Sequence, residues 1–239
     1  MEEFPHPQAT CDGGDLDCGS GLLLIIKKSM DPLQPGEVLE VRSREGSVAG
    51  DLPAWCRRVK HEFIGSRPNS LDTSYFIRKG GSENHLKQDL EAARGYQWSV
   101  RIRANKDSAK VHSRNHTFMI GQPADFGSQV EAPSSVDYLL GALGGCLTVG
   151  FSQHASRKGM VIDALELSVK GKLGNVLYHL QLEDEGSAKF SEINGTLYVS
   201  SPEEEESLQK IWQLTLERSP IYQTLAGQVK MDFRFEIIL

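Results

Sequence analysis

The chain has 239 residues, of which 39% are hydrophobic and 24% charged, and its formal net charge at pH 7 is −6. This length allows two ordinary domains, and the acidic balance argues against a broad basic surface for nucleic acid. The start of the chain lacks the basic and apolar regions of a signal peptide, and the longest aliphatic run, Leu22–Ile26, is too short to cross a bilayer. Four scattered cysteines without zinc-like spacing favour a reducing compartment. We therefore expect a cytoplasmic protein with no metal, no organic cofactor and no membrane or nucleic-acid partner.

Residues 1–80 are predicted to form a small α/β unit. The pair Pro35-Gly36 indicates a turn, and the residues after it alternate apolar and polar side chains as a half-buried strand does. In chain order we expect a strand at 8–11, a helix at 19–30, a strand at 37–42, a helix at 48–62, and strands at 63–66 and 74–78. Residues 81–95 are polar and glycine-containing, and we interpret them as a linker that holds a short helix at 86–93.

Residues 96–239 are predicted to form a second, larger α+β domain. Pro133-Ser134-Ser135 is a good helix start, and apolar residues then recur at helical spacing to about Lys158. Ser201-Pro202 begins a second helix that ends near Arg218. Strands are expected at 98–104, 109–113, 116–121, 164–171, 177–183, 192–199 and 229–238. Strand runs that bracket two helices are typical of an α+β domain.

The longest predicted helix carries the main chemical candidate, Cys146. Gly141, Gly144 and Gly145 precede this cysteine, and small residues on a helix let another backbone come close. A thiol held at such a crossing and near polar groups is suited to act as a reagent. The alternative is that Cys146 is a small buried residue and that the glycines only permit packing.

The N-terminal unit resembles the TusA/SirA-like sulfur-carrier family. The resemblance rests on the stretch Asp12–Leu22, the turn Gln34–Glu37, the segment Asp51–Cys56 and the closing Ile77–Gly81, in that order. It covers nearly all of residues 8–81. The family's fold implies a two-layer sandwich with two helices on a four-stranded sheet.

This resemblance matches Cys18 to the carrier cysteine of the family, which opens the first helix. A thiolate there faces unpaired N–H groups and the positive end of the helix dipole. Here the family's Cys-Pro-x-Pro motif is replaced by Cys18-Gly19-Ser20-Gly21, and Asp15 and Asp17 oppose thiolate formation. Three alternatives therefore stay open for this unit: a persulfide carrier, an inactive retained fold, or a docking module. Cys11 and Cys56 are interpreted as core thiols.

The C-terminal domain resembles the OsmC/Ohr superfamily, whose members reduce peroxides with a cysteine pair. The resemblance rests on the stretch Ala132–Cys146 and on the order of strands, central helix, strands, second helix and final strand. It spans about residues 96–239. The family's fold implies an intertwined homodimer in which two sheets wrap the central helices, with the active thiols near the interface.

The same resemblance suggests roles for further residues. Cys146 matches the attacking cysteine, and Ser219, before Pro220, takes the place of the resolving cysteine. Because serine forms no disulfide, an external thiol would have to complete a catalytic cycle. Arg114 is the positional candidate for an arginine that stabilises a thiolate or a leaving oxyanion, and a plain surface charge is the alternative.

The acid and the histidines of this region are weaker candidates. The peroxidase branch places a glutamate where Val136 stands, and Asp137, one residue later, is rotated by about 100° on a helix. His116 is interpreted like Arg114, and His154 is interpreted as a structural histidine because about 12 Å along the axis separates it from Cys146.

Three functions follow as hypotheses. The first is a thiol-dependent redox enzyme that uses Cys146 to reduce a hydroperoxide, with an external thiol as reductant. The second is a sulfur-transfer protein that moves a persulfide between Cys18 and Cys146. The third is a dimeric binding or regulatory module without enzymatic activity.

Overall fold

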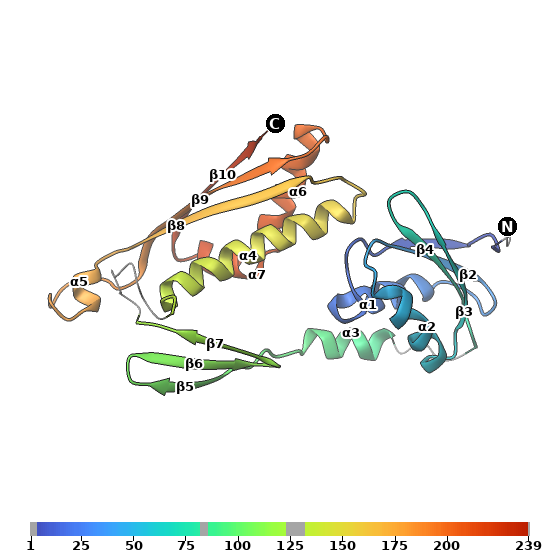
Figure 1. Cartoon of the computed structure of the whole chain (residues 1–239), viewed down its shortest axis with the longest axis horizontal. Helices are drawn as coiled ribbons and strands as arrows, with labels where there is room; N and C mark the ends of the chain where they lie inside the picture. The colour runs from blue at the N-terminus through green and yellow to red at the C-terminus, as the bar shows by residue number, and fades with distance from the viewer. Residues whose placement is uncertain (1–3, 82–85, 123–131, 239) are drawn as a thin grey trace. The chain divides into compact units, whose positions relative to one another are not determined.

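The computed structural model describes residues 4–81, 86–122 and 132–238, except for the side chain of Asn105. The chain forms two compact units, the first built mainly from residues up to 97 and the second mainly from those after it (Figure 1). Each unit combines helices with a β-sheet, so the fold class is α+β.

The first unit is a four-stranded sheet with helices packed against it. The strands are β1 (Ala9–Asp12), β2 (Val38–Ser43), β3 (Glu62–Pro68) and β4 (Thr73–Arg78), in the spatial order β1-β2-β4-β3. Strand β1 runs parallel to β2, and the other two pairs are antiparallel. The helical elements are the short turn η1 (Cys18–Leu22), α1 (Leu23–Met30), α2 (Val48–Arg58) and α3 (Leu86–Arg94). This arrangement agrees with the expected sheet and two helices, while kinship with the TusA-like family stays a prediction.

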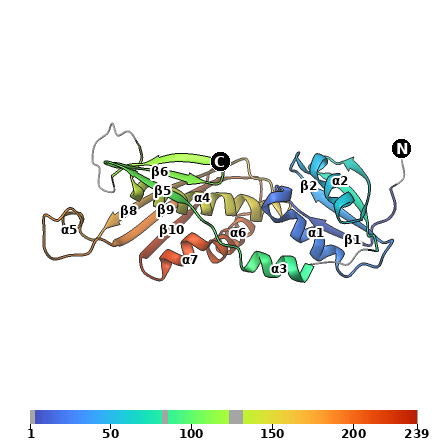
Figure 2. The same ribbon diagram turned by 90° about the horizontal axis from the view of Figure 1, so that it is seen from below.

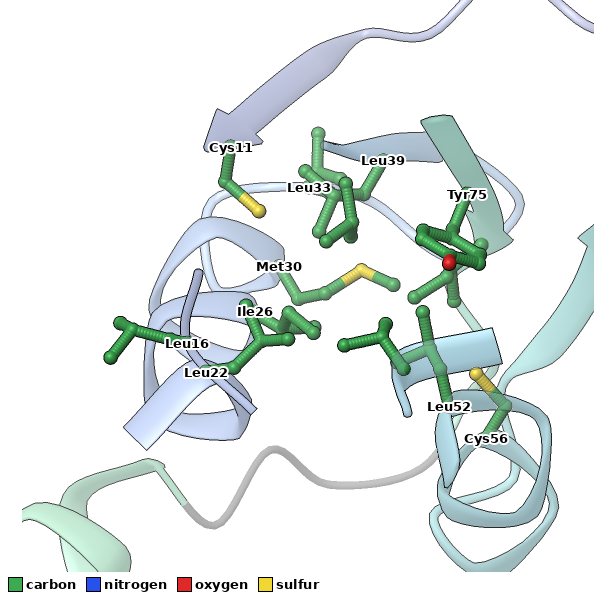
Figure 3. Packing of buried hydrophobic residues seen from close by; sticks show 13 residues of the cluster. Cys11, Leu16, Leu22, Ile26, Met30, Leu33, Leu39, Leu52, Cys56 and Tyr75 are labelled. Atoms are coloured by element: carbon green, nitrogen blue, oxygen red, sulfur yellow. The ribbon is translucent and has the colours of Figure 1, made fainter. Parts of the chain in front are cut away.

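Side chains from both layers meet in the core of the first unit (Figure 3). Ile26 and Met30 of α1 and Leu52 of α2 are at most 1% exposed and pack with the sheet residues Leu39 and Ile77. Apolar residues four apart in α1 lie on one face of the helix, which explains why that face is covered by the sheet. The core therefore fixes both helices and, with them, the segment that carries Cys18.

Lys79 closes this unit by capping α1. Its ammonium group donates to the main-chain carbonyls of Met30 at 2.8 Å and Leu33 at 2.6 Å, at the end of the helix where carbonyl oxygens lack helical partners. Asp89 of α3 pairs with Lys27 of α1, so the helix within the predicted linker packs as part of the first unit. Residues 82–85 of that predicted linker lie outside the described residues.

The second unit contains two three-stranded sheets. Strands β5 (Arg101–Asn105), β6 (Ser108–Ser113) and β7 (His116–Ile120) form an antiparallel meander. Strands β8 (Ala164–Leu173), β9 (Phe190–Ser200) and β10 (Lys230–Ile237) form the other sheet, in the order β10-β9-β8, with β10 parallel to β9. Figure 2 shows the two sheets as separate sets of strands. The helices are α4 (Ser135–Ser156), α5 (Val176–His179), α6 (Glu205–Arg218) and α7 (Pro220–Ala226).

Helix α4 is the central helix of this unit. Four of its residues, at intervals of four, are fully buried: Leu143, Leu147, Phe151 and Ala155. They pack with Ile193 and Leu197 of β9 and Trp212 of α6 in one core. Within the described part of the chain, α4 is the one helix long and apolar enough to cross a membrane by length and composition. The core helix of a domain meets the same two criteria, and its contacts with β9 and α6 are those of a core helix.

The prediction of a strand at 177–183 is wrong. Val176–His179 forms α5 instead, because the Asn175 side chain caps this turn by accepting a hydrogen bond from the Tyr178 N–H at 3.1 Å. Leu177, Leu180 and Leu182 of this segment are exposed in the connection between β8 and β9. The second predicted helix is also shorter than expected, since it ends at Arg58.

Candidate functional site

The candidate site is centred on Cys146, midway along α4. The residue next to it in the chain, Leu147, and Leu143, three residues before it, are fully buried and hold this part of the helix against the core. Gly145, directly before the cysteine, is exposed. Cys146 is half-buried between these two faces and is a free thiol. The packing therefore fixes the sulfur in place and still leaves part of the residue accessible.

The sulfur of Cys146 lies 3.1 Å from the hydroxyl oxygen of Ser219. Ser219 is 4% exposed and begins α7, where its hydroxyl oxygen accepts a hydrogen bond from the Tyr222 N–H at 3.2 Å. A serine hydroxyl has one hydrogen to donate and two lone pairs. Because the Tyr222 N–H uses a lone pair, the hydroxyl hydrogen can be directed at the Cys146 sulfur. Ser219 is thus a helix cap that also lies within hydrogen-bond distance of the Cys146 sulfur, and either group can be the donor in that contact.

The start of α4 is held by a reciprocal cap. Asp137 accepts hydrogen bonds from the Ser134 N–H at 2.9 Å and the Ser134 hydroxyl at 2.7 Å, and the Ser134 oxygen accepts from the Asp137 N–H at 3.1 Å. This is the capping-box arrangement that satisfies unpaired N–H groups at a helix start. Asp137 therefore serves the helix start, two and a half turns before Cys146 on the geometry of about 3.6 residues per turn.

Arg114 lies in the two-residue turn between β6 and β7, with a φ of 52°. It lines a cavity together with Arg101, Arg103 and His112, and Cys146 is not among the residues that line this cavity. The described structure thus groups Arg114 with basic residues of its own sheet. A role for Arg114 beside Cys146 stays a prediction. His116 is exposed at the start of β7, and His154 is half-buried near the end of α4.

Cys18 stands in surroundings that do not favour its thiolate. It opens the turn η1, where the Asp17 side chain caps the turn by accepting from the Ser20 N–H at 2.6 Å. Burial, together with the nearby Asp51 and Asp17 carboxylates, raises the pKa of the Cys18 thiol above its ordinary value. The expected effect of a helix start is outweighed first by burial of the thiol and then by the two neighbouring carboxylates. A carrier role for Cys18 stays a prediction.

The two remaining cysteines are core residues, as expected. Burial raises the pKa of Cys11 to about 11 and that of Cys56 to about 12. Thiols of this kind are inert at neutral pH because the thiolate is the reactive form. Within the ranges that the structure describes, no group of three His, Cys, Asp or Glu side chains lies together as a metal site requires.

Comparison with known proteins supports this picture of the second unit. Residues 127–234 match the family model described as OsmC-like protein. Residues 127–234 are thus similar in sequence to OsmC-like proteins. A solved OsmC-like protein from Mycoplasma pneumoniae has 20% sequence identity and a TM-score of 0.53, and the match covers 61% of this chain and 99% of that one. That likeness shows a shared fold.

Two further solved structures also match the chain. An OsmC-like protein of unknown function from Vibrio cholerae has 12% identity and a TM-score of 0.48, with 59% of this chain and 99% of that chain covered. An organic hydroperoxide resistance protein from Elizabethkingia anophelis has 11% identity and a TM-score of 0.48, with coverages of 60% and 99%.

The sequence pattern singled out Cys146, and the resemblance to the OsmC/Ohr superfamily added Ser219, but neither indicated the cavity lined by Arg101, Arg103 and His112. The alternation of basic and apolar residues along 101–104 was a signal for it, since alternate residues of a strand share a face.

Proposed function

We propose that the OsmC-like domain is a thiol-dependent redox enzyme that reduces organic hydroperoxides through Cys146. The observation that supports this proposal best is the contact of 3.1 Å between the Cys146 sulfur and the Ser219 hydroxyl oxygen. The contact holds the sulfur beside a polar group, which can hydrogen-bond the oxidised sulfur that the reaction forms. The half-buried position supplies both a fixed geometry and a path for a small substrate.

In the proposed first step the Cys146 thiolate attacks the terminal oxygen of the hydroperoxide. A sulfur–oxygen bond forms, the O–O bond breaks, and the alkoxide takes a proton from solvent to leave as an alcohol. Cys146 is oxidised to a sulfenic acid while the peroxide is reduced. Ser219, whose hydroxyl already faces the sulfur, is positioned to hydrogen-bond the new sulfenic acid.

For the second step we assign a thiol from outside the chain. Ser219 cannot form a disulfide, Cys11 and Cys56 are buried in the first unit, and the raised pKa of Cys18 disfavours the thiolate that would have to attack. An external thiol therefore condenses with the sulfenic acid and releases water, and a second thiol reduces the mixed disulfide to restore Cys146. A reducing cytoplasm would supply such thiols, which agrees with the expected location of the protein.

The test is consumption of cumene hydroperoxide by the full chain in the presence of dithiothreitol. The variant Cys146→Ser is expected to lose the activity, and Cys18→Ser, which removes another half-buried thiol, is expected to keep it. Trapping with dimedone should label the wild type at Cys146 after peroxide treatment. Equal peroxide consumption by wild type and Cys146→Ser would sink the proposal.

We further propose that the domain works as a homodimer. Opposite the buried stripe of α4, Ala142, Gly145 and Val149 form an apolar and exposed stripe, with Val149 57% exposed. An apolar stripe on a central helix is expected to be covered, because exposed apolar area costs about 25 cal/mol per Å². A second copy of the same helix fits this stripe because its small residues permit close approach.

Gly145→Leu tests the dimer without disturbing the single chain. A Cβ added at Gly145 would meet no atom within 4 Å in the protomer, and replacing a helical glycine raises helix propensity. The variant should therefore fold but dissociate in analytical ultracentrifugation. Gly50→Leu in α2, where an added Cβ also meets nothing within 4 Å, is the matched control and should leave the mass unchanged. A wild type that sediments as a monomer would refute the dimer.

A further inference from the structure

The β5–β7 sheet has one strongly basic face. Arg101 pairs in register with His112, and Arg103 pairs with Lys110, so these four side chains share a face of the antiparallel ladder. Arg101, Arg103 and Lys110 are exposed. Between residues 99 and 121 the chain has Asp107 as its single acid, whereas the whole protein has a net charge of −6. Positive charge is therefore concentrated on this face against the general trend of the chain.

A cavity of about 600 Å³ lies next to these strands, and Arg114 of the β6–β7 turn is among its lining residues. Its lining consists of Ser99, Val100, Arg101, Arg103, His112 and Arg114. Three arginines and a histidine are therefore among the described residues that line one cavity, which concentrates positive charge and hydrogen-bond donors there.

The ring of His112 contacts the neighbouring strand through one of its two nitrogens. Its Nδ1 lies 3.1 Å from the Thr117 hydroxyl oxygen, on the neighbouring strand. When the Thr117 hydroxyl donates to Nδ1, the neutral ring carries its hydrogen on Nε2, so His112 can donate a hydrogen bond without being charged. With its hydrogen on Nε2, His112 adds an N–H donor to those of the three arginines that line the cavity.

We propose that this cavity binds a small organic phosphate, with the three arginines gripping phosphate oxygens. Guanidinium groups match phosphate oxygens in paired, charge-assisted hydrogen bonds, and several arginines in one hollow favour a ligand with more than one negative charge. The volume suits a small molecule. Cys146 is not among the lining residues, so this binding site is separate from the proposed redox chemistry and does not depend on it.

The experiment is isothermal titration calorimetry of the full chain with inorganic pyrophosphate in about 0.15 M salt, where long-range charge effects are screened. We expect saturable binding that Arg103→Gln weakens about tenfold or more, because the change removes a charge-assisted pair of hydrogen bonds. Arg234→Gln on β10, which removes another exposed arginine from a strand, is the matched control and should leave the affinity unchanged. Circular dichroism of each variant establishes that it is folded.

Three results would overturn the proposal. The first is the absence of binding up to about 1 mM pyrophosphate, because a specific phosphate site should bind more tightly than that. The second is an equal loss of affinity in Arg103→Gln and Arg234→Gln, which would mean that pyrophosphate binding depends only on the net charge of the protein. The third is tighter binding of a single-stranded oligonucleotide that Arg103→Gln abolishes, which would make the face a nucleic-acid contact.

Discussion

Replacing Ser219 by cysteine is expected to convert Cys146 into half of a disulfide pair. The two side-chain ends are 3.1 Å apart, and Ser219 is held by its place at the start of α7. A disulfide needs sulfur atoms about 2.05 Å apart, so the side chains have to approach by about 1 Å. Small rotations about the side-chain bonds supply this approach without moving the helices.

The size of the effect follows from the loop that the bond closes. Cys146 and Ser219 are 73 positions apart in the chain. The chain-entropy relation then gives a stabilisation of about 4 kcal/mol for the oxidised variant over the reduced one. For a domain of this size the thermal midpoint should rise by roughly 10 °C on oxidation.

The use of two oxidants separates the contact between the two side chains from the reactivity of Cys146 with peroxide. Diamide oxidises neighbouring thiols whatever their reactivity with peroxide, so disulfide formation with diamide tests the contact alone. Formation with cumene hydroperoxide tests the contact and the proposed sulfenic acid together. Intact mass should fall by two hydrogens, and the double variant Cys146→Ser, Ser219→Cys serves as the control that cannot close the bond. If diamide leaves both thiols free to alkylation in the folded variant, the two side chains do not meet as described.

Three further changes test the packing and the buried groups. Phe151→Ala should lower the free energy of unfolding by about 3–5 kcal/mol in urea titrations, since Phe151 is fully buried; a loss below about 1 kcal/mol would contradict its core position. Lys79→Met should cost about 1–3 kcal/mol, because three carbonyls at the end of α1 lose a charged donor; an unchanged unfolding midpoint would refute the cap. The folded-state pKa values of Cys11 and Cys56, about 11 and about 12, lie above the ordinary thiol value. Their contribution to stability is complete below that ordinary value and is lost as the pH rises toward 12, by up to about 1.4 kcal/mol per pH unit for each thiol. In Cys56→Ala the free energy of unfolding should fall less steeply as the pH rises toward 12. If this free energy falls equally steeply with pH in the wild type and the variant, the burial of the Cys56 thiol is contradicted.

The sequence located most of the fold because its main elements carry strong local signals. The apolar residues at intervals of four in α4 and the alternation along β10 are patterns that only a covered helix and a half-covered strand produce. The segment 177–183 differs from its prediction because Tyr178, Leu180 and Leu182 alternate as strand residues do, while the deciding feature is one side-chain cap from Asn175. A single hydrogen bond of this kind has no periodicity from which it could be read.

The candidate site was only partly predictable for a related reason. The glycines before Cys146 and the serine at 219 point to a special thiol, but their contact joins positions 73 apart, and only the packing of α7 against the core brings it about. The grouping of Arg101, Arg103 and His112 likewise depends on the register of β5 against β6. Shifting that register by one residue would turn the arginines to the other face.

The cap that starts α7 links the chemical state of Cys146 to the second element of the site. Ser219 touches the sulfur of Cys146 through its hydroxyl, and the same oxygen holds the N–H of Tyr222, whose ring packs edge-on against Phe233 at 5.9 Å between centroids. Any atom attached to that sulfur arrives next to this tyrosine's anchoring bond. Chemical modification of Cys146 is therefore expected to act directly on the start of α7.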